Sequence, residues 1–368
     1  MFAGKTILIT GGAGFIGARL AADLSCHTRV VVFDNFHPQT HDSPTETRLR
    51  LARCGVEVLV GDLRDLAMLQ AAIAKTKPDT IYHLAAETGT GQSFDHPARY
   101  CDVNVTGTAH LVQAIRQSAP RLKRIVLASS RAVYGEGAYV GAEGSPVTVF
   151  ERRAEDMAAG YFLPRGANSF PVTPIPTRAA CPVAPSSIYA ATKLMQEYLL
   201  RQAFWGTATG VGILRLQNVY GPGQSLHNPY TGVLSIFCRH LQERRGLEIH
   251  EDGQITRDFL SVDDAVRAFI LMGQIAKLPP EIIDIGSGQG TSILEVAQKL
   301  AALTGLPDTA LTITGAYRPG DIRHAVADIR RASDLLGWMP EVPLEAGLQA
   351  LVDWSGARNR GLAVPAAG

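Results

Sequence analysis

Hydrophobic and polar positions alternate along the first 135 residues between short β-like runs and stretches of helical spacing. The apolar, β-branched runs that predict strands are residues 6–10, 29–33, 56–60, 80–84 and 124–128. The stretches whose apolar residues recur at helical spacing are residues 15–24, 66–75 and 103–117. Strands that alternate with helices in this way form a parallel sheet with helices on both faces. The pattern therefore predicts an α/β fold built on a doubly wound parallel sheet.

This pattern breaks at residues 136–185, which are rich in Gly, Pro and Ala and show helical spacing only over residues 150–161. We expect a long loop that carries one helix here. Loops of this length are uncommon in compact domains and are usually functional or disordered.

Regular patterning returns after residue 185. Helices are predicted at residues 188–204, 233–244 and 293–304 and from residue 262 onward, and β-like runs at 212–216, 247–250 and 282–285. Residues 356–368 are small and polar, so we expect this tail to fray.

The charge balance and the cysteines narrow the class of protein. The 368 residues include 35 Lys and Arg against 34 Asp and Glu, so no bulk charge attracts nucleic acid or an anionic membrane. No stretch approaches the roughly 18 uncharged apolar residues of a membrane span, and the first residues read as a strand rather than a signal peptide. The five cysteines form no CxxC pair, which argues against a disulfide framework or a zinc site. We therefore expect a cytoplasmic protein without a metal.

A glycine-rich turn follows the first predicted strand and opens the first predicted helix. Gly11, Gly14 and Gly17 have the spacing that lets a backbone turn tightly against a pyrophosphate at a helix N-terminus, as in Rossmann dinucleotide sites. Asp34 ends the second strand, where its carboxylate would accept hydrogen bonds from the adenosine ribose hydroxyls and repel a 2′-phosphate. The pattern therefore favours NAD over NADP. Asp62 follows the third predicted strand, in a position to meet the adenine.

A tyrosine and a lysine four residues apart carry the candidate chemistry. Tyr189 and Lys193 lie on one face of a predicted helix, and an ammonium beside a phenol lowers the pKa of the phenol by stabilising the phenolate. A phenolate near neutral pH is a competent general base for the proton of an alcohol. Ser130 follows the strand predicted at 124–128 and supplies a hydroxyl that can hydrogen-bond the reacting oxygen.

Taken together, these motifs resemble those of the extended short-chain dehydrogenase/reductases, and more narrowly those of the NAD-dependent nucleotide-sugar epimerases and dehydratases. The resemblance runs from about Lys5 to Trp354 and rests on residues 11–17, 34, 61–63, 83–86, 104, 129–135 and 189–193. It implies an NAD-binding Rossmann domain at residues 1–185, with an insertion at 136–185. In residues 186–355, the remainder of the Rossmann core would alternate with a smaller C-terminal α/β domain that binds the nucleotide sugar, and residues 356–368 would form a flexible tail.

The resemblance also implies roles for individual residues. Tyr189 would be the acid/base, Lys193 would bind the nicotinamide ribose and tune Tyr189, and Ser130 would orient the sugar hydroxyl. The residues expected to bind NAD, besides Tyr189 and Lys193, are Gly11, Gly14, Phe15, Ile16, Gly17, Asp34, Asn35, Asp62, Leu63, Leu84, Ala85, Ala86 and Asn104. The residues expected to bind the nucleotide-diphosphate sugar are Thr88, Ser130, Arg131, Asn218, Arg257, Arg318 and Asp321.

Three reactions share this scaffold, and the residues after Ser130 separate them. A 4,6-dehydratase of the family carries an acidic pair directly after the catalytic hydroxyl residue, and decarboxylases usually carry a Glu there. This chain has Arg131 and Ala132 instead, which argues against both reactions. A 4-epimerase is the favoured interpretation, with a nucleotide-sugar 4-ketoreductase as the alternative. A non-catalytic NAD-sensing protein commonly lacks the tyrosine or the lysine, and this chain keeps both.

Residues 84–93, 129–137 and 220–232 are most similar to those of bacterial deoxysugar epimerases that act on dTDP-L-rhamnose. The resemblance implies inversion at C4 of a dTDP- or UDP-hexose through a transient 4-keto intermediate, with dTDP-L-rhamnose and its 6-deoxy-L-talose epimer among the candidates. The helices at 103–117 and 188–204 match those that pair across a two-fold axis in the family, so we expect a homodimer. We expect the insertion to form a flap that excludes water from the sugar.

Overall fold

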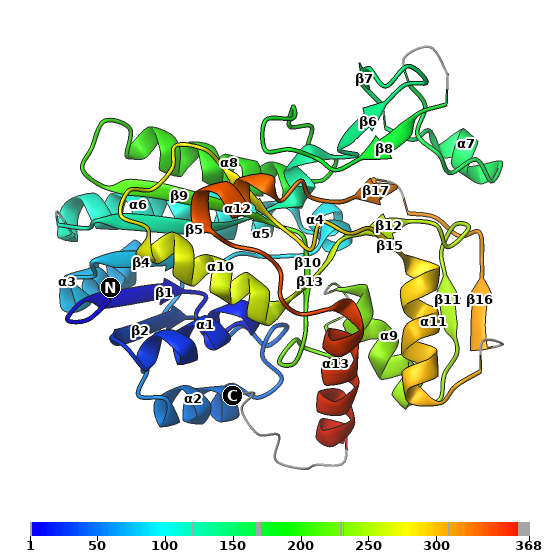
Figure 1. Ribbon diagram of the computed structural model, residues 1–368. Helices are drawn as coiled ribbons and strands as arrows, with labels where there is room; N and C mark the ends of the chain where they lie inside the picture. The colour runs from blue at the N-terminus through cyan, green and yellow to red at the C-terminus, as the bar shows by residue number, and fades with distance from the viewer. Residues whose placement is uncertain are drawn as a thin grey trace.

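The computed structural model of the chain describes residues 2–359 except 120, 150, 167–170, 229, 231, 308–309 and 319. Its centre is a seven-stranded sheet in the order β14-β9-β5-β4-β1-β2-β3, with every neighbouring pair parallel (Figure 1). The strands are β1 Thr6–Thr10, β2 Arg29–Asp34, β3 Glu57–Val60, β4 Thr80–His83, β5 Arg124–Ser130, β9 Gly210–Leu216 and β14 Ile283–Ile285. The order reverses between β1 and β4, and ligands bind at the carboxyl edge of such a switch point. The predicted doubly wound α/β fold is confirmed.

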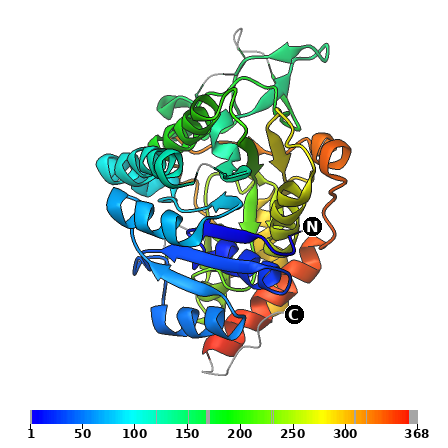
Figure 2. The same ribbon diagram turned by 90° about the vertical axis from the view of Figure 1, so that its left-hand side faces the viewer.

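Helices cover both faces of the sheet (Figures 1 and 2). Because side chains of a strand alternate between faces, Ile7 and Ile9 of β1 belong to one core and Leu8 to the other. The first core includes Phe269 of α10, and the second includes Leu111 of α6. The helices over the first core are α1 Phe15–Ser25 and α10 Val262–Gln274, and those over the second are α3 Leu66–Thr76, α6 Gly107–Ser118 and α8 Ile188–Ala203. Burial on both faces explains why the strands are apolar throughout.

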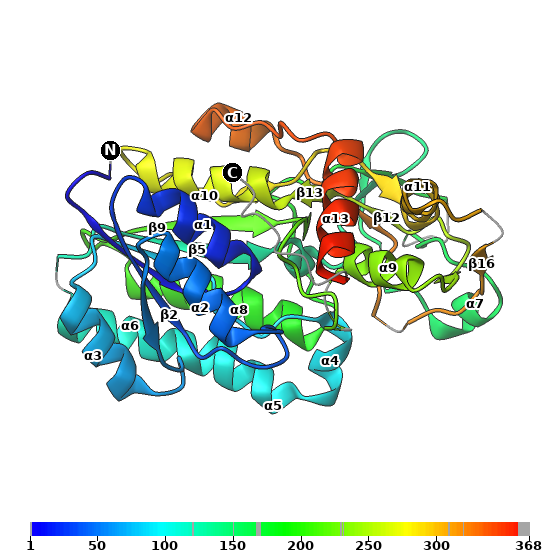
Figure 3. The same ribbon diagram turned by 90° about the horizontal axis from the view of Figure 1, so that it is seen from below.

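A second group of helices and short strands lies beside one end of the sheet (Figure 3). It has its own core, in which Leu234, Phe237, Val296, Leu300 and Leu348 pack together. Its elements are α9 Val233–Gln242, α11 Ile293–Thr304, α13 Leu344–Asn359, β11 Leu247–Ile249 and β16 Leu311–Ile313. Two small sheets, β10-β13 and β15-β12-β17, complete the fold. Their strands are β10 Asn218–Tyr220, β12 Thr256–Arg257, β13 Phe259–Ser261, β15 Thr291–Ser292 and β17 His324–Ala325.

Several helices lack the apolar pattern that would have predicted them. Helix α2 (Pro44–Arg53) buries only Leu51 and is capped by the preceding Ser43, whose side chain accepts a hydrogen bond from the Glu46 backbone. Helix α13 continues to Asn359, so residues 356–359 of the expected tail are helical, while residues 360–368 lie outside the described part. The other helices that were not predicted are α4 Thr90–Asp95, α5 Pro97–Tyr100 and α12 Arg330–Leu336.

The insertion at 136–185 is not the long loop that the sequence predicts. Its described residues form a three-stranded antiparallel sheet in the order β7-β6-β8 and the short helix α7. The bounds are β6 Ala138–Val140, β7 Pro146–Val147, α7 Ala154–Ala158 and β8 Thr173–Ile175. The helix expected at 150–161 is thus shorter, and Phe150 itself lies outside the described residues. Strands this short, two of them with a proline, leave no readable alternation in the sequence.

A buried ion pair ties α8 to the central sheet. Arg215 of β9 donates from Nε and Nη2 to the two carboxylate oxygens of Glu197 on α8, at 2.9 and 2.7 Å. The two side chains are 3% and 2% exposed. Ser129, at the end of β5, donates to the same carboxylate, and the Arg215 guanidinium stacks on the Tyr134 ring. The start of α8, which carries Tyr189, is therefore held beside the end of β5.

We predict that Arg215→Met lowers the free energy of unfolding by about 3–5 kcal/mol, because it leaves the Glu197 carboxylate buried without its partner. The control is Arg29→Met, which removes a half-exposed cation from a surface pair with Glu57 and should cost no more than about 1 kcal/mol. Denaturant unfolding followed by circular dichroism measures both. Equal losses in the two variants would contradict the prediction.

Candidate active site

A cavity of about 520 Å³ lies at the carboxyl edge of the sheet. Its wall comes from the turn after β1, the ends of β2 to β5, the start of α8 and parts of the C-terminal half. The expected site residues that line it are Gly11, Gly14, Phe15, Ile16, Gly17, Asp34, Asn35, Asp62, Leu63, Leu84, Ala85, Ala86, Thr88, Ser130, Arg131, Tyr189, Lys193, Asn218, Arg257 and Asp321. Two of the expected residues, Asn104 and Arg318, are not part of the lining.

The glycine turn brings three backbone segments close together. A Cβ on Gly11, whose φ is +68°, would lie 2.5 Å from the backbone N of Ala85, and a Cβ on Gly17 would lie 2.3 Å from the carbonyl O of Gly11. Asp34 is buried beside this turn, and its carboxylate accepts from the backbone N of Ala13 at 2.9 Å and of Phe36 at 2.8 Å. A narrow backbone cradle at a helix N-terminus, with a fixed carboxylate next to it, suits the phosphates and ribose hydroxyls of a dinucleotide.

Asp62 is fixed at the end of β3. Its carboxylate accepts from Asn35 Nδ2 at 2.9 Å and from the side chain of Arg64 at 2.8 and 2.9 Å. The hydrogen bonds from Arg64 hold the pKa of Asp62 well below its usual range. Asp62 therefore stays ionised and keeps the ends of β2 and β3 together at the cavity wall.

Ser130, Tyr189 and Lys193 all line the cavity, Ser130 from the end of β5 and the other two from α8. Burial raises the pKa of Tyr189, and a hydrogen bond with Ser130 acts in the opposite direction. Burial also lowers the pKa of Lys193 to about 7, although the charge of Glu197 opposes this shift. Lys193 Nζ donates to Gln196 Oε1 at 2.5 Å. The expected effect of Lys193 on the pKa of Tyr189 stays a prediction.

Asn104 lies behind the cavity wall. It belongs to a π-helical turn, Cys101–Thr106, at the start of the helix predicted at 103–117. Its Oδ1 accepts from the backbone N of Glu87 at 2.7 Å, and its Nδ2 donates to Thr192 Oγ1 at 2.9 Å. Asn104 therefore joins the segment after β4 to α8, and its partner Glu87 lines the cavity.

Two arginines, Arg131 and Arg257, line the cavity. Arg131 is buried, its Nη2 donates to the carbonyl O of Gly135 at 2.7 Å, and its Nε has no hydrogen-bond partner among the described residues. Burial, together with the charge of Arg257, lowers the pKa of Arg131 to about 10, so it stays charged at neutral pH. Arg257 pairs with Asp321 at 2.7 Å. Arg318, in contrast, is exposed and lies near His250.

Some of the residues that line the cavity were not predicted from the sequence. The stretch after β2 contributes His37, Gln39, Thr40 and His41. His41 Nε2 lies 3.4 Å from the Asp34 carboxylate, and Gln39 exchanges side-chain hydrogen bonds with Gln92 at 2.8 and 3.1 Å. These residues form no motif. Their position directly after a strand, at the carboxyl edge of the sheet, was the one available signal.

The parallel sheet, the glycine turn and the Ser130–Tyr189–Lys193 set define an extended short-chain dehydrogenase/reductase. Residues 8–147 match the family model described as GDP-mannose 4,6 dehydratase, and residues 166–286 match that of the NAD dependent epimerase/dehydratase family. A dTDP-L-rhamnose 4-epimerase of Burkholderia thailandensis is 43% identical over 356 residues, which cover 95% of each chain. The chain belongs to the NAD-dependent epimerase/dehydratase family, and the predicted resemblance is confirmed.

Solved structures agree with this assignment. A UDP-glucose 4-epimerase of Thermotoga maritima, determined with UDP-glucose, is 26% identical with a TM-score of 0.78, covering 96% of this chain and 99% of its own. A UDP-glucose 4-epimerase of Thermus thermophilus, determined with NAD, is 26% identical with a TM-score of 0.73, covering 95% of this chain and 98% of its own. The family is NAD dependent, and the narrow cradle at Gly11 and the fixed Asp34 carboxylate fit that cofactor.

Three further observations concern the described residues alone. None of their helices is both long and apolar enough to cross a membrane. Within the same residues no three His, Cys, Asp or Glu side chains come together in a way that could hold a metal ion. The five cysteines are free thiols.

We predict that Gly11→Ala lowers the NAD content of the purified protein at least about tenfold, because a Cβ at this position collides with the backbone of Ala85 and pushes the turn out of shape. The matched control is Gly55→Ala, which has a similar φ of +74° but no atom within 4 Å of the new Cβ. Both substitutions place a side chain on a left-handed backbone, but only the one at Gly11 collides with a neighbouring backbone segment. NAD released on denaturation is measured by chromatography. A Gly11→Ala protein that is folded and retains full NAD would contradict the prediction.

Proposed function

We propose that this chain is an NAD-dependent nucleotide-sugar 4-epimerase that inverts C4 of a dTDP- or UDP-hexose. The observation that carries the proposal is one cavity that is lined by the glycine turn, by the Ser130–Tyr189 pair and by Arg257. The relative from Burkholderia thailandensis makes dTDP-L-rhamnose the first substrate to test.

In the proposed reaction the protein moves one proton and lets the sugar turn. NAD, when bound, would supply the acceptor and donor of the C4 hydride. Tyr189 takes the proton of the C4 hydroxyl and later gives it back, while Ser130 holds the reacting oxygen in place. Because burial raises the pKa of Tyr189, its phenolate needs a positive charge nearby, and Lys193, with a pKa of about 7, can carry that charge near neutral pH.

The diphosphate is the pivot about which the 4-keto sugar turns. We assign Asn218, Arg257 and Asp321 to the nucleotide diphosphate, because a guanidinium presents forked donors to phosphate oxygens. Thr88 and Arg131 are assigned to the sugar. The assignment of Arg318 to the nucleotide sugar stays a prediction, since its side chain is exposed and outside the cavity lining.

The residues after Ser130 argue against the dehydratase and decarboxylase reactions. Arg131 is a buried cation and Ala132 has no titratable group, so neither provides the acid and base that elimination of water needs. A ketoreductase remains the alternative. It would consume stoichiometric NAD(P)H, whereas an epimerase regenerates its NAD in every cycle.

We predict that the wild-type protein interconverts dTDP-L-rhamnose and its C4 epimer without added cofactor, and that Tyr189→Phe slows this at least about 10²–10⁴-fold, because the acid/base group is lost. Tyr161→Phe, which changes an exposed tyrosine of the insertion, is the control and should keep full activity. C4 inversion is followed by NMR on dTDP-L-rhamnose, UDP-glucose and UDP-glucuronate. A strict need for NAD(P)H would favour the ketoreductase, and no turnover of any sugar nucleotide would overturn the proposal.

The proposal includes a homodimer and a cytoplasmic location. Helix α8 exposes Met195 and Tyr198 at 44% and 48%, and large exposed apolar side chains on a helix favour a partner surface. The free state of the cysteines supports a reducing compartment.

We expect the wild-type protein to sediment as a dimer at micromolar concentration, and Met195→Asp to sediment as a monomer, because a carboxylate would be buried in the interface. Analytical ultracentrifugation measures both. A monomeric wild-type protein would exclude the dimer.

A further inference from the structure

The insertion supplies none of its described residues to the lining of the cavity. Its described part is therefore not the flap over the sugar that the sequence suggests. Instead, it contacts the chain segment 320–323, of which Gly320, Asp321 and Ile322 line the cavity. The insertion thus reaches the site indirectly, through this segment.

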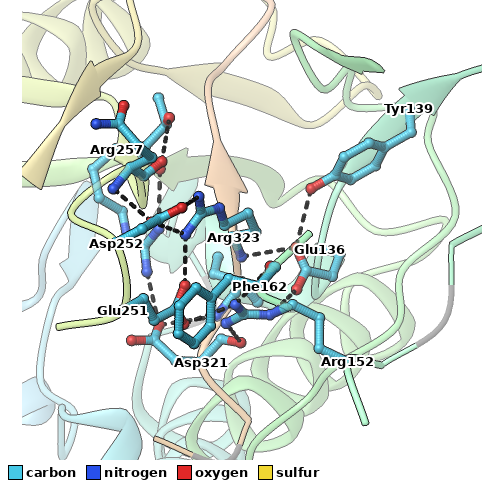
Figure 4. Close-up of polar contacts among 12 residues, drawn as sticks. Glu136, Tyr139, Arg152, Phe162, Glu251, Asp252, Arg257, Asp321 and Arg323 are labelled. Carbon is cyan, nitrogen blue, oxygen red and sulfur yellow. Dashed lines mark hydrogen bonds and ion pairs between the residues drawn. The ribbon is translucent and has the colours of Figure 1, made fainter. Parts of the chain in front are cut away.

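Two buried side chains of the insertion, Arg152 and Glu136, belong to a network of charges with the C-terminal half (Figure 4). Arg152 Nη1 donates to Glu251 Oε1 at 2.7 Å, and Arg152 Nε lies 3.3 Å from Glu136 Oε1. Arg323 donates to Glu251 Oε2 and pairs with Asp252, both at 2.7 Å. The four inner side chains are between 1% and 9% exposed, and Asp252 at the rim is 44% exposed. Two guanidiniums therefore balance two buried carboxylates away from water.

The same two insertion residues hold the backbone next to the cavity at two points. Arg152 Nη2 donates to the carbonyl O of Asp321 at 2.7 Å, and Glu136 Oε2 accepts from the backbone N of Arg323 at 2.8 Å (Figure 4). On the cavity side, the Asp321 carboxylate accepts from Arg257 Nη2 at 2.7 Å. Asp321 is thus bound by Arg152 through its carbonyl and by Arg257 through its carboxylate.

The chain after this segment is also attached to the insertion. The backbone N of Thr177 donates to the carbonyl O of Val326 at 2.8 Å, and the backbone N of Asp328 donates to the carbonyl O of Thr177 at 2.9 Å. The segment that carries Asp321 is therefore held by the insertion at its start and again a few residues later.

We propose that Arg152 is a positioning residue for nucleotide-sugar recognition, and that the insertion is a strut that sets the position of the Asp321–Arg257 pair in the cavity. This proposal rests on the proposed function, in which that pair binds the nucleotide diphosphate. Arg152 does not line the cavity, so it acts through Asp321. Its loss weakens the binding of substrate and transition state alike, which raises KM and leaves kcat nearly unchanged.

The test uses a variant that removes the Arg152 contact without leaving a charge unpaired. Arg152→Met alone leaves the Glu136 carboxylate without its guanidinium partner and risks unfolding. The double variant Arg152→Met/Glu136→Gln removes one charge of each sign and leaves Glu251 and Asp252 paired with Arg323. The matched control is Arg153→Met, the neighbouring insertion arginine, whose side chain is 63% exposed and pairs with Asp156. Circular dichroism and NAD content establish that each full-length protein is folded.

The readouts are the Kd of dTDP and of UDP, measured by calorimetry on the NAD-loaded protein, and the separate KM and kcat of the epimerisation. We expect the double variant to raise Kd and KM about tenfold, to change kcat less than about threefold and to keep its NAD, while Arg153→Met matches the wild type in each.

Two results would overturn the proposal in different ways. If the folded double variant binds the nucleotide as the wild type does, or loses kcat rather than affinity, Arg152 is not a positioning residue and the proposed function stands. If the wild-type protein binds neither dTDP nor UDP, the proposed function fails, and the role of Arg152 fails with it.

Discussion

The site depends on a turn that has no room for a side chain. The backbone of Gly11 lies so close to Ala85, and that of Gly17 so close to Gly11, that one Cβ at either position would collide with main-chain atoms. This closeness brings the end of β1, the end of β4 and the N-terminus of α1 into one crevice, and it places the backbone N of Ala13 where Asp34 binds it. The other parts of the cavity wall are arranged around this contact.

Charge in this protein is local. Although the net charge of the protein is only +1, the cavity is lined by the cations Arg131 and Arg257 and by the anion Asp321. Burial acts differently on the groups of the wall: it favours the neutral forms of Tyr189 and Lys193 but leaves Arg131 ionised at neutral pH. A site of this kind has fixed cations for an anionic ligand and titratable groups where a proton must move.

The parts of the fold that the sequence predicts are those that repeat a local pattern. The strands and helices of the central sheet are buried on defined faces, so their apolar spacing is regular, and the glycine turn and the Tyr189–Lys193 pair are short motifs. Helix α2 is polar, and the insertion strands are two or three residues long, so neither leaves a periodic signal. Contacts such as that of Arg152 with Glu251 join distant parts of the chain, and no local pattern encodes them. Asn104 is one of the residues on which the resemblance rests, but only the structure shows that it lies behind the cavity wall.

The chain order of the strut residues has a consequence for folding during synthesis. Domains form from the N-terminus as the chain leaves the ribosome. The glycine turn, Asp34 and Ala85 emerge early, so the cofactor crevice is the first part that can assemble. Arg152 emerges long before its partner Glu251, so its charge stays solvated until the C-terminal half arrives. The insertion is therefore synthesised before the residues that hold it in place. The site is complete only when the segment around residue 321 has been translated.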